Sequence, residues 1–453
     1  MATAMFVTVI FHEKNTKKLK ILCNGCKLYI NISIKQICYR IFFMENSDTR
    51  HWKLNLAMMW FSQLMVITGF AGAVPFIPLF FQKMGFTDEG ECGMYVSLFA
   101  FFSSLAYAIF LPIWGTLSDR YGVKIMLLRG TFGTALIFPI MGYVNNAWLL
   151  IGLRFLTAAC AGTTAAAQAL IVKNTPENKM GFALGVFSTA YWCGMMLGNV
   201  VGGLVVHYWG FTSAFWFCGI LYFVGGIAVL FAHEDFKPVL TVKTQKVRTG
   251  GIGSKLMSTF TVAVWMCLIM FLINAFVRTF EGNYLAMLVE QLTDKPAYWT
   301  GIISAFVSLG ALISGALFGY LADRVEPRKL IVPALALSGF FLVIQAAAES
   351  LFAFGFARTM MFVTGGGLAP VYQKILSSIT PKRKRGQVFG WTSTFNGVGN
   401  MSSSLVAGAI IGIIGTRGIF LLGAILTFLL IPVIMYMTKK ITNSPFYRVL
   451  ATK

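Results

Sequence analysis

Four ionisable side chains lie inside long apolar runs of this sequence, where a charge is costly and usually serves a function. They are Arg154, Arg278, Glu281 and Arg358. Glu281 is the only carboxylate well inside such a run, and a buried carboxylate can exchange a proton near neutral pH. We therefore predict that Glu281 couples a proton or another cation to transport. The alternative is that Arg278 and Glu281, three residues apart, only neutralise each other.

These residues share helical faces with other polar side chains. Asn274 lies four residues before Arg278 and seven before Glu281, which places all three on one face of a helix. Arg154 and Gln168 share a face of another helix, with only small or hydroxylated residues between them on that face. We expect both faces to line a polar cavity.

Residue sets that would support enzymatic chemistry or metal binding do not occur. The four histidines (His12, His51, His207 and His233) are scattered outside the interiors of the apolar runs, and no GxSxG or HExxH is present. Cys23 and Cys26 form a CxxC, but no second pair or histidine set follows at metal-site spacing. We predict no enzymatic activity, no metal and no cofactor.

The composition indicates an all-α integral membrane protein. Apolar residues make up 57% of the 453 residues and charged residues only 12%, whereas soluble proteins carry about 25% charged residues. Twelve apolar runs are long enough to be transmembrane helices. We place them at about 54–82, 92–114, 125–145, 148–172, 180–206, 211–232, 258–289, 297–321, 330–348, 351–376, 386–414 and 417–438.

The basic residues are distributed very unequally between the two sides of these helices. The termini and the loops after even-numbered helices hold most of the Lys and Arg residues, including the run 382–385. The opposite side has only Lys83, Lys295 and Arg417. By the positive-inside rule, both termini are cytoplasmic and the protein is multi-pass in the cell (inner, cytoplasmic) membrane. This distribution accounts for the net charge of +21, so we predict no binding to nucleic acid.

The chain contains an internal repeat of about 204 residues. Gly115-Thr-Leu-Ser-Asp119-Arg120 recurs as Gly319-Tyr-Leu-Ala-Asp323-Arg324. We therefore predict two parallel six-helix halves at 44–232 and 258–453, joined by a cytoplasmic linker at 233–257. Residues 1–43 form a basic leader without a long apolar run, and Met44 opens a short polar stretch before the first helix. Our hypothesis is that Met44 is the native start.

Two motifs resemble signatures of one transporter family. Gly115, Asp119, Arg120, Gly122 and Lys124 are similar to the cytoplasmic loop signature of the major facilitator superfamily, with Gly319, Asp323 and Arg324 as its second copy. The resemblance implies the twelve-helix major facilitator fold and a latch that holds the cytoplasmic side shut. In this interpretation Gly115 permits a close approach between helices.

The fifth predicted helix carries the second motif. Gly185, Gly194, Gly198, Asn199, Gly202 and Gly203 resemble the pattern G(x)8G(x)3GP(x)2GG of drug:proton antiporters, with Asn199 in place of the usual proline. Small residues at this spacing form a smooth packing face, which we expect to meet the helix at 297–321. A packing face without any bearing on transport remains the alternative.

The resemblance extends to function. Stretches of the first half, such as Pro75-Phe-Ile-Pro-Leu, are similar to bacterial multidrug exporters of the MdtG type. This implies a monomer that exports lipophilic drugs or amphipathic compounds across the lipid bilayer, driven by the proton gradient. In the family, helices 1, 4, 7 and 10 build the central cavity, so Arg154, Arg278, Glu281 and Arg358 are expected there. The alternative is a carrier of the same fold that imports or exchanges one small metabolite.

Overall fold

The computed structural model describes residues 51–176, 179–234, 262–322, 324–380 and 385–442, together with four two-residue strands near the N-terminus. The strands β1 (Thr8–Val9) and β3 (Ile21–Leu22) pair antiparallel, as do β2 (Lys18–Leu19) and β4 (Ile32–Ser33). The predictions about Met44, the CxxC pair, most of the linker and residues 382–384 fall outside the described residues.

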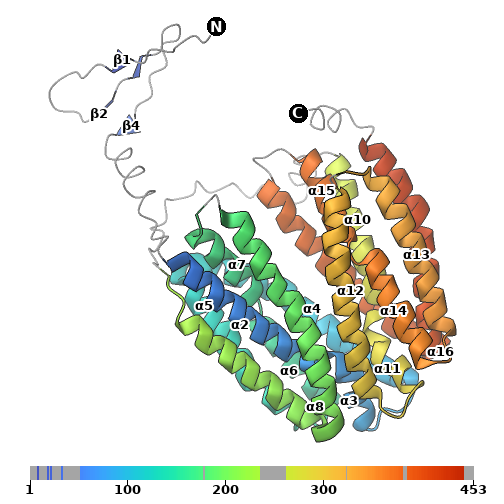
Figure 1. The fold of residues 1–453 in the computed structure, drawn as a ribbon. Coiled ribbons are helices and arrows are strands. Elements are labelled where there is room, and N and C mark those ends of the chain that lie inside the picture. Colours follow the sequence, from blue (N-terminus) through green and yellow to red (C-terminus); the bar gives the residue numbers. More distant parts are fainter. Residues whose placement is uncertain are drawn as a thin grey trace, which may run out of the picture.

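Almost all of the described chain is helical, and the helices form two bundles that lie side by side (Figure 1). The first bundle contains α2 (Trp52–Ala73), η2 (Val74–Phe76), α3 (Ile77–Lys83), α4 (Glu89–Tyr121), α5 (Val123–Met141), α6 (Ala147–Cys160), α7 (Thr163–Asn174) and α8 (Met180–Leu230). The second contains α10 (Val262–Phe280), η4 (Gly282–Tyr284), α11 (Leu285–Glu290), α12 (Pro296–Ala322), α13 (Pro327–Ala347), α14 (Leu351–Gly365), α15 (Leu368–Ile379) and α16 (Arg385–Thr442).

Two of these helices each contain a reversal of the chain. Helix α8 has 51 residues, and a straight helix of that length would measure about 76 Å, more than twice the thickness of a bilayer core. Gly210 interrupts α8 at φ 80°, and Gly415 interrupts α16 at φ 69°, a backbone region that favours glycine. Ten apolar helices of the described chain are long enough to span a membrane. Because α8 and α16 each supply two spans, the expected twelve result.

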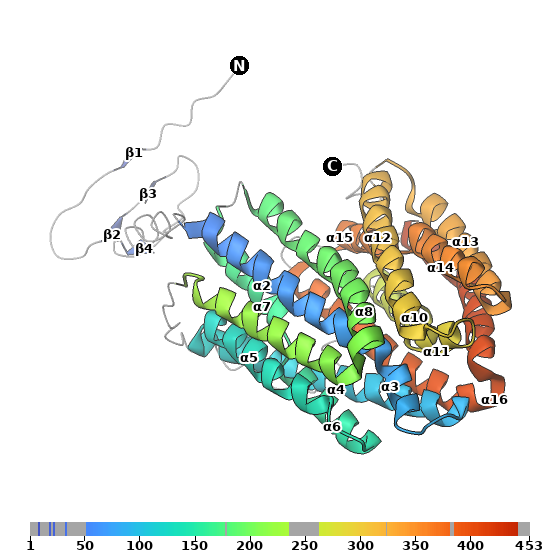
Figure 2. The same cartoon turned by 60° about the horizontal axis from the view of Figure 1, so that its bottom comes forward.

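The two bundles repeat the same irregularities. The first helix of each bundle breaks into a 3₁₀ turn, at Val74–Phe76 and at Gly282–Tyr284. The fourth helix of each bundle is also interrupted, near Gly162 in the first bundle and near Gly366 in the second. These two glycines are 204 residues apart in the sequence. The internal repeat of the sequence is therefore also a structural repeat, seen in Figures 1 and 2 as two half-molecules of similar build.

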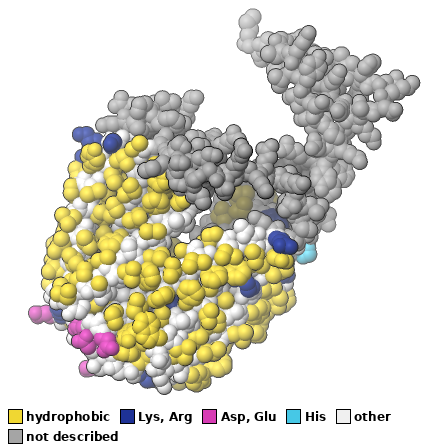
Figure 3. Space-filling view, turned by 180° about the vertical axis from the view of Figure 1, so that it is seen from behind, with side chains coloured by type: hydrophobic (Ala, Val, Ile, Leu, Met, Phe, Trp, Pro, Cys, Tyr) yellow, Lys and Arg dark blue, Asp and Glu magenta, His cyan; other side chains and the backbone are white. Residues whose placement is uncertain are grey.

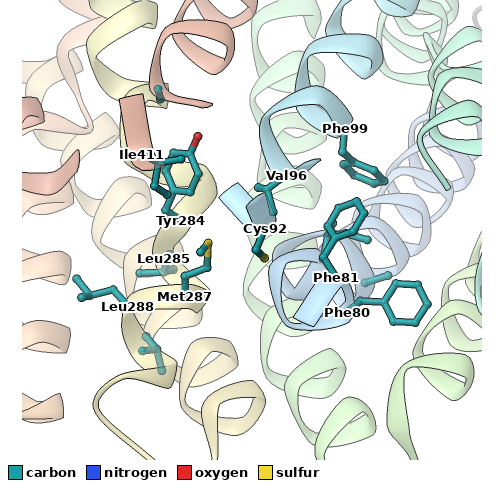
Figure 4. Close-up of a cluster of buried hydrophobic side chains, with 14 of the residues drawn as sticks. Phe80, Phe81, Cys92, Val96, Phe99, Tyr284, Leu285, Met287, Leu288 and Ile411 are labelled. Atoms are coloured by element: carbon teal, nitrogen blue, oxygen red, sulfur yellow. The ribbon is translucent and has the colours of Figure 1, made fainter. Parts of the chain in front are cut away.

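The halves are packed together at one end of the molecule, which we call the closed end. Buried apolar side chains from both halves meet there, with Phe81, Cys92 and Val96 facing Met287 and Ile411 (Figure 4). The hydroxyls of Ser97 and Tyr284 hydrogen bond across this boundary. Nearby, the Glu89 carboxylate accepts hydrogen bonds from Thr416 N and Oγ1, both at 2.8 Å, and from Gln291 Nε2 at 2.8 Å.

The halves are apart at the other end, which we call the basic end because Arg120, Lys124, Lys173 and Arg324 lie there. Figure 3 shows Lys and Arg side chains at this end of both lobes, whereas the Asp and Glu side chains visible in that view gather at the opposite end. A Cβ atom built on Gly115, Gly185, Gly319 or Gly390 would meet no other atom within 4 Å. The close approach predicted for Gly115 is therefore not made in this conformation, because the ends of the helices are splayed.

Candidate transport cavity

A cavity of about 450 Å³ lies between the two halves and is lined by both. Helices α2, α4, α6 and α8 of the first half contribute to it, as do α10, α12, α14 and α16 of the second. A further cavity of about 700 Å³ adjoins it between the first half and the start of α16, and shares Phe70, Arg154 and Asn400 with it. The helices expected to build a central cavity do line it, and helices 2, 5, 8 and 11 line it as well.

Arg154 on α6 lies where the two cavities meet. Its guanidinium carbon is 5.2 Å from the centre of the Phe70 ring and 5.4 Å from that of Phe99, and Nη1 donates to Thr157 Oγ1 at 3.4 Å. The buried Nε has no hydrogen-bond partner among the described residues, and no described carboxylate forms an ion pair with Arg154. Arg154 is thus a buried cation held by aromatic faces rather than by an acid.

Arg278 on α10 projects into the central cavity and is exposed there. Its guanidinium carbon lies 5.5 Å from the centre of the Phe362 ring. The ion pair of Arg278 with Glu281, which was the alternative to a coupling role, does not form, since the only described ion pair of Glu281 is with Arg358. The alternative interpretation of the Arg278–Glu281 spacing is therefore wrong, because Arg358 from α14 occupies the position beside the carboxylate.

Glu281 and Arg358 form an ion pair inside the second half. Arg358 Nη1 lies 3.0 Å from Glu281 Oε1, and the two side chains are only 4% and 1% exposed, respectively. The same Nη1 donates to Gln345 Oε1 of α13 at 3.3 Å, whereas Glu281 Oε2 has no hydrogen-bond partner among the described residues. Glu281 and Arg358 do not line the central cavity, contrary to the sequence-based expectation, since burial of this pair turns both side chains into the helical bundle.

The predicted polar face of α10 is present. Asn274, Arg278 and Glu281 together line a small cavity of about 60 Å³ within the second half, between α10, α13, α14 and α16. Arg278 and Phe362 each line both this small cavity and the central one, and Arg278 is the charged residue of the two.

Gln168 does not reach the central cavity and is exposed on α7. One straight helix over 148–172, as predicted from the sequence, would place Arg154 and Gln168 on a shared face. Gly162 at φ 106° instead separates α6 from α7. Because the helix restarts in a new direction, the face that includes Arg154 ends before Gln168.

The glycine motif of α8 packs mainly on a different helix from the one expected. Built Cβ atoms on Gly194, Gly198 and Gly202 would lie 2.9, 2.4 and 2.3 Å from atoms of α2. Only Gly203 lies against α12, where its Cβ would come within 2.8 Å of Ala297 O. Asn199 Nδ2 also reaches α12 and donates to Ser308 Oγ at 3.4 Å. The helix continues through Asn199 without a break.

The described residues of the loop signature make their contacts with other residues of the same half of the protein. Gly122 adopts φ 96° between α4 and α5, and Lys124 Nζ donates to the carbonyls of Leu230 and Ala232 at 2.7 Å. The Glu234 carboxylate accepts from the backbone N–H groups that begin α5. Arg120 lies over the ring of Tyr121 in α4, and Arg324, just past the end of α12, lies over the ring of Tyr320. The side chain of Asp119 and the whole of Asp323 fall outside the described residues, so the latch stays a prediction.

Comparison with known proteins identifies the family. The family model described as Major Facilitator Superfamily matches residues 59–295 and 284–447. The multidrug resistance protein MdtG of Rahnella sp. (strain Y9602) is 31% identical over 386 residues, which cover 83% of this chain and 92% of that protein. MdtG of Klebsiella pneumoniae (strain 342) is 28% identical over 389 residues, covering 84% and 93%.

Solved structures share the fold at low sequence identity. The crystal structure of the nucleoside transporter NupG superposes with a TM-score of 0.68 at 14% identity, over 85% of this chain and 99% of that one. The match of the family model over most of the chain, the twelve apolar spans and the cavity between two repeated halves agree. This chain belongs to the Major Facilitator Superfamily and is a multi-pass membrane transporter.

Proposed function

We propose that this protein exports lipophilic or amphipathic compounds from the cell by alternating access, driven by proton entry. The observation that carries the proposal is a central cavity between halves that are packed together at the closed end and apart at the basic end. With the basic end at the cytoplasm, this is the inward-facing state that loads substrate before export. The relatives whose names describe multidrug resistance support the direction and the class of cargo.

The Glu281–Arg358 pair is the proposed site of proton coupling. An ionised pair holds α10 and α14 together, and protonation of Glu281 removes the negative charge that Arg358 faces at 3.0 Å. The small cavity beside Glu281 also reaches Arg278, which lines the central cavity, so the carboxylate has a polar connection to the substrate space. Proton binding at Glu281 would thus bias the packing of the second half and, through it, the equilibrium between the two states.

Inverted membrane vesicles from cells that lack their major exporters provide the test. The full chain is expressed, a proton gradient is imposed, and lipophilic cations, anions and neutral compounds are added while the gradient is followed. We expect substrate-dependent proton release, which Glu281→Gln abolishes. Glu326→Gln is the matched control, because Glu326 is exposed at the start of α13 and should retain wild-type release.

The outcomes separate the parts of the proposal. Release that persists in Glu281→Gln would remove Glu281 from the coupling step and leave export intact. No proton movement with any compound, together with uptake of a metabolite by intact cells, would overturn proton-driven export in favour of a metabolite carrier.

A further inference from the structure

The central cavity contains positive charge and no negative charge. Among the described residues that line it, Arg154 and Arg278 are the only charged ones, and no aspartate or glutamate is present. The adjoining cavity has the same character, since Arg154 is the only charged residue among the described ones that line it. From this we infer that the transported compounds are organic anions, namely amphipathic molecules that carry a carboxylate, sulfonate or phosphonate. The inference rests on the proposed export function and names its substrate class.

Nearby carboxylates do not balance the two arginines. Glu281 follows the end of α10, three residues after Arg278, but it is buried and engaged by Arg358 at 3.0 Å. Glu89 lies at the closed end, where Gln291 and Thr416 use both of its oxygens. An arginine in the membrane interior without a counter-ion is costly. A bound anion would supply the missing charge, and a guanidinium can hold a carboxylate or phosphonate through two parallel hydrogen bonds.

Three of the five aromatic rings that line the central cavity already lie beside a guanidinium, and the other two belong to Tyr191 and Trp192. Organic cations are usually bound over ring faces. Here Arg154 already lies over Phe70 and Phe99, and Arg278 lies near Phe362. At those three rings a cation would compete with a fixed guanidinium, and elsewhere in the cavity the two arginines would still repel it.

The rest of the lining suits the body of an amphipathic molecule. Trp192, Met195 and Val307 give an apolar surface, and Asn199 brings an amide whose Oδ1 has no hydrogen-bond partner among the described residues. The volume of about 450 Å³ lies within the range of small-molecule sites. The anionic group of the substrate is assigned to Arg278, because the Arg278 side chain is exposed to the cavity whereas that of Arg154 is buried.

Three pyrene compounds that share one hydrocarbon frame test the inference. They are 1-pyrenebutyrate, 1-pyrenebutanol and a 1-pyrenebutyl trimethylammonium salt. Their binding to the full chain in phosphatidylcholine nanodiscs is followed by fluorescence anisotropy. The signal from empty nanodiscs is subtracted to correct for binding to the lipid. We expect the anion to bind at least about tenfold more tightly than the alcohol, and the cation to bind more weakly than either. Arg278→Gln should weaken only the anion, by about tenfold or more, and Arg278→Lys should restore part of the loss. Lys83→Gln, which removes an exposed cation at the closed end, is the matched control and should match the wild type for all three compounds.

Several results would overturn the inference. These are equal or tighter binding of the cation, no saturable binding of pyrenebutyrate, or an Arg278→Gln variant that loses all three compounds equally while its thermal unfolding is unchanged. Displacement of pyrenebutyrate by added phosphatidylglycerol would assign the site to lipid headgroups and also overturn it. Efflux of the same compounds in energised inverted vesicles separates this test from the proposed function. Export of the cation alone would keep the function and reject the anion, whereas saturable anion binding without export of any compound would reject the function and keep the site.

Discussion

The tightest helix contact of the first half gives a sharp prediction about stability. A Cβ atom built on Gly202 of α8 would lie 2.3 Å from Gly72 Cα and 2.4 Å from Gly72 O of α2. Since carbon atoms pack at about 3.5–4.0 Å, Gly202→Ala requires the two helices to separate by about 1.2–1.7 Å. Overpacking of this kind costs about 1–3 kcal/mol, and we expect the upper end because the obstacle is backbone rather than a movable side chain.

Gly185 is the matched control on the same helix. A Cβ atom there meets nothing within 4 Å, so Gly185→Ala should change the free energy of unfolding by no more than about 0.5 kcal/mol. The assay is reversible unfolding of the purified protein in mixed micelles of a neutral detergent with increasing dodecyl sulfate. A Gly202→Ala variant as stable as the wild type, or equal losses in both variants, would refute the packing argument.

Three further predictions concern polar contacts of the described chain. Glu281→Gln and Arg358→Gln should each lower the free energy of unfolding by about 2–4 kcal/mol, and the double variant should lower it by less than the sum of the two. Strictly additive losses in this double-mutant cycle would contradict the pairing. Cys92 is fully buried at the closed end, and a variant that keeps only this cysteine can report on opening of that end. In that variant, Glu89→Ala should speed maleimide labelling of Cys92 several-fold, because it removes the hydrogen bonds between the halves. An unchanged labelling rate would show that apolar packing alone seals that end. Lys124→Met should lower the free energy of unfolding by about 1–2 kcal/mol, since two helix-terminal carbonyls lose a charged donor, and no change would show that water replaces the lysine without cost.

The fold could be predicted from the sequence because a bilayer imposes a simple rule on it. Each span needs an apolar run, and the repeat of the loop signature shows that the two halves are related. Even the reversals at Gly210 and Gly415 lie between predicted helices, at 206–211 and 414–417. The first helix contains prolines at positions 75 and 78, and it breaks into a 3₁₀ turn at Val74–Phe76, as the missing N–H group of proline favours.

The site could be predicted only in part, because helical spacing says nothing about partners on other helices. It placed Asn274, Arg278 and Glu281 on one face, and they do share a cavity. Helical spacing could not show that Arg358, which follows Glu281 by 77 residues in the sequence, lies closer to the Glu281 carboxylate than Arg278 does. Nor did it predict Gln345, which looks like any other polar residue near a helix end.

Two other outcomes depended on local geometry. The break at Gly162 removed Gln168 from the cavity, and a glycine in an apolar run gives no sign of whether the helix continues past it. Glu89 was missed because it lies in the polar stretch between predicted helices, where an acid normally contacts only water. Its function at the closed end depends on the N-terminus of a span that begins over three hundred residues later.

The unpaired arginines of the cavity also make the carrier sensitive to membrane voltage. A charge that crosses the whole membrane field gains or loses about 2.3 kcal/mol for every 100 mV, and one that moves part of the way gains that fraction. If the basic end lies in the cytoplasm, as the distribution of Lys and Arg predicts, an inside-negative potential favours the empty, doubly positive cavity in its cytoplasm-facing position. A bound monoanion halves that charge, so the loaded carrier turns outward against a smaller electrical cost than the empty one. The same potential expels the released anion, and the resting voltage of the cell would therefore act as a rectifier for export.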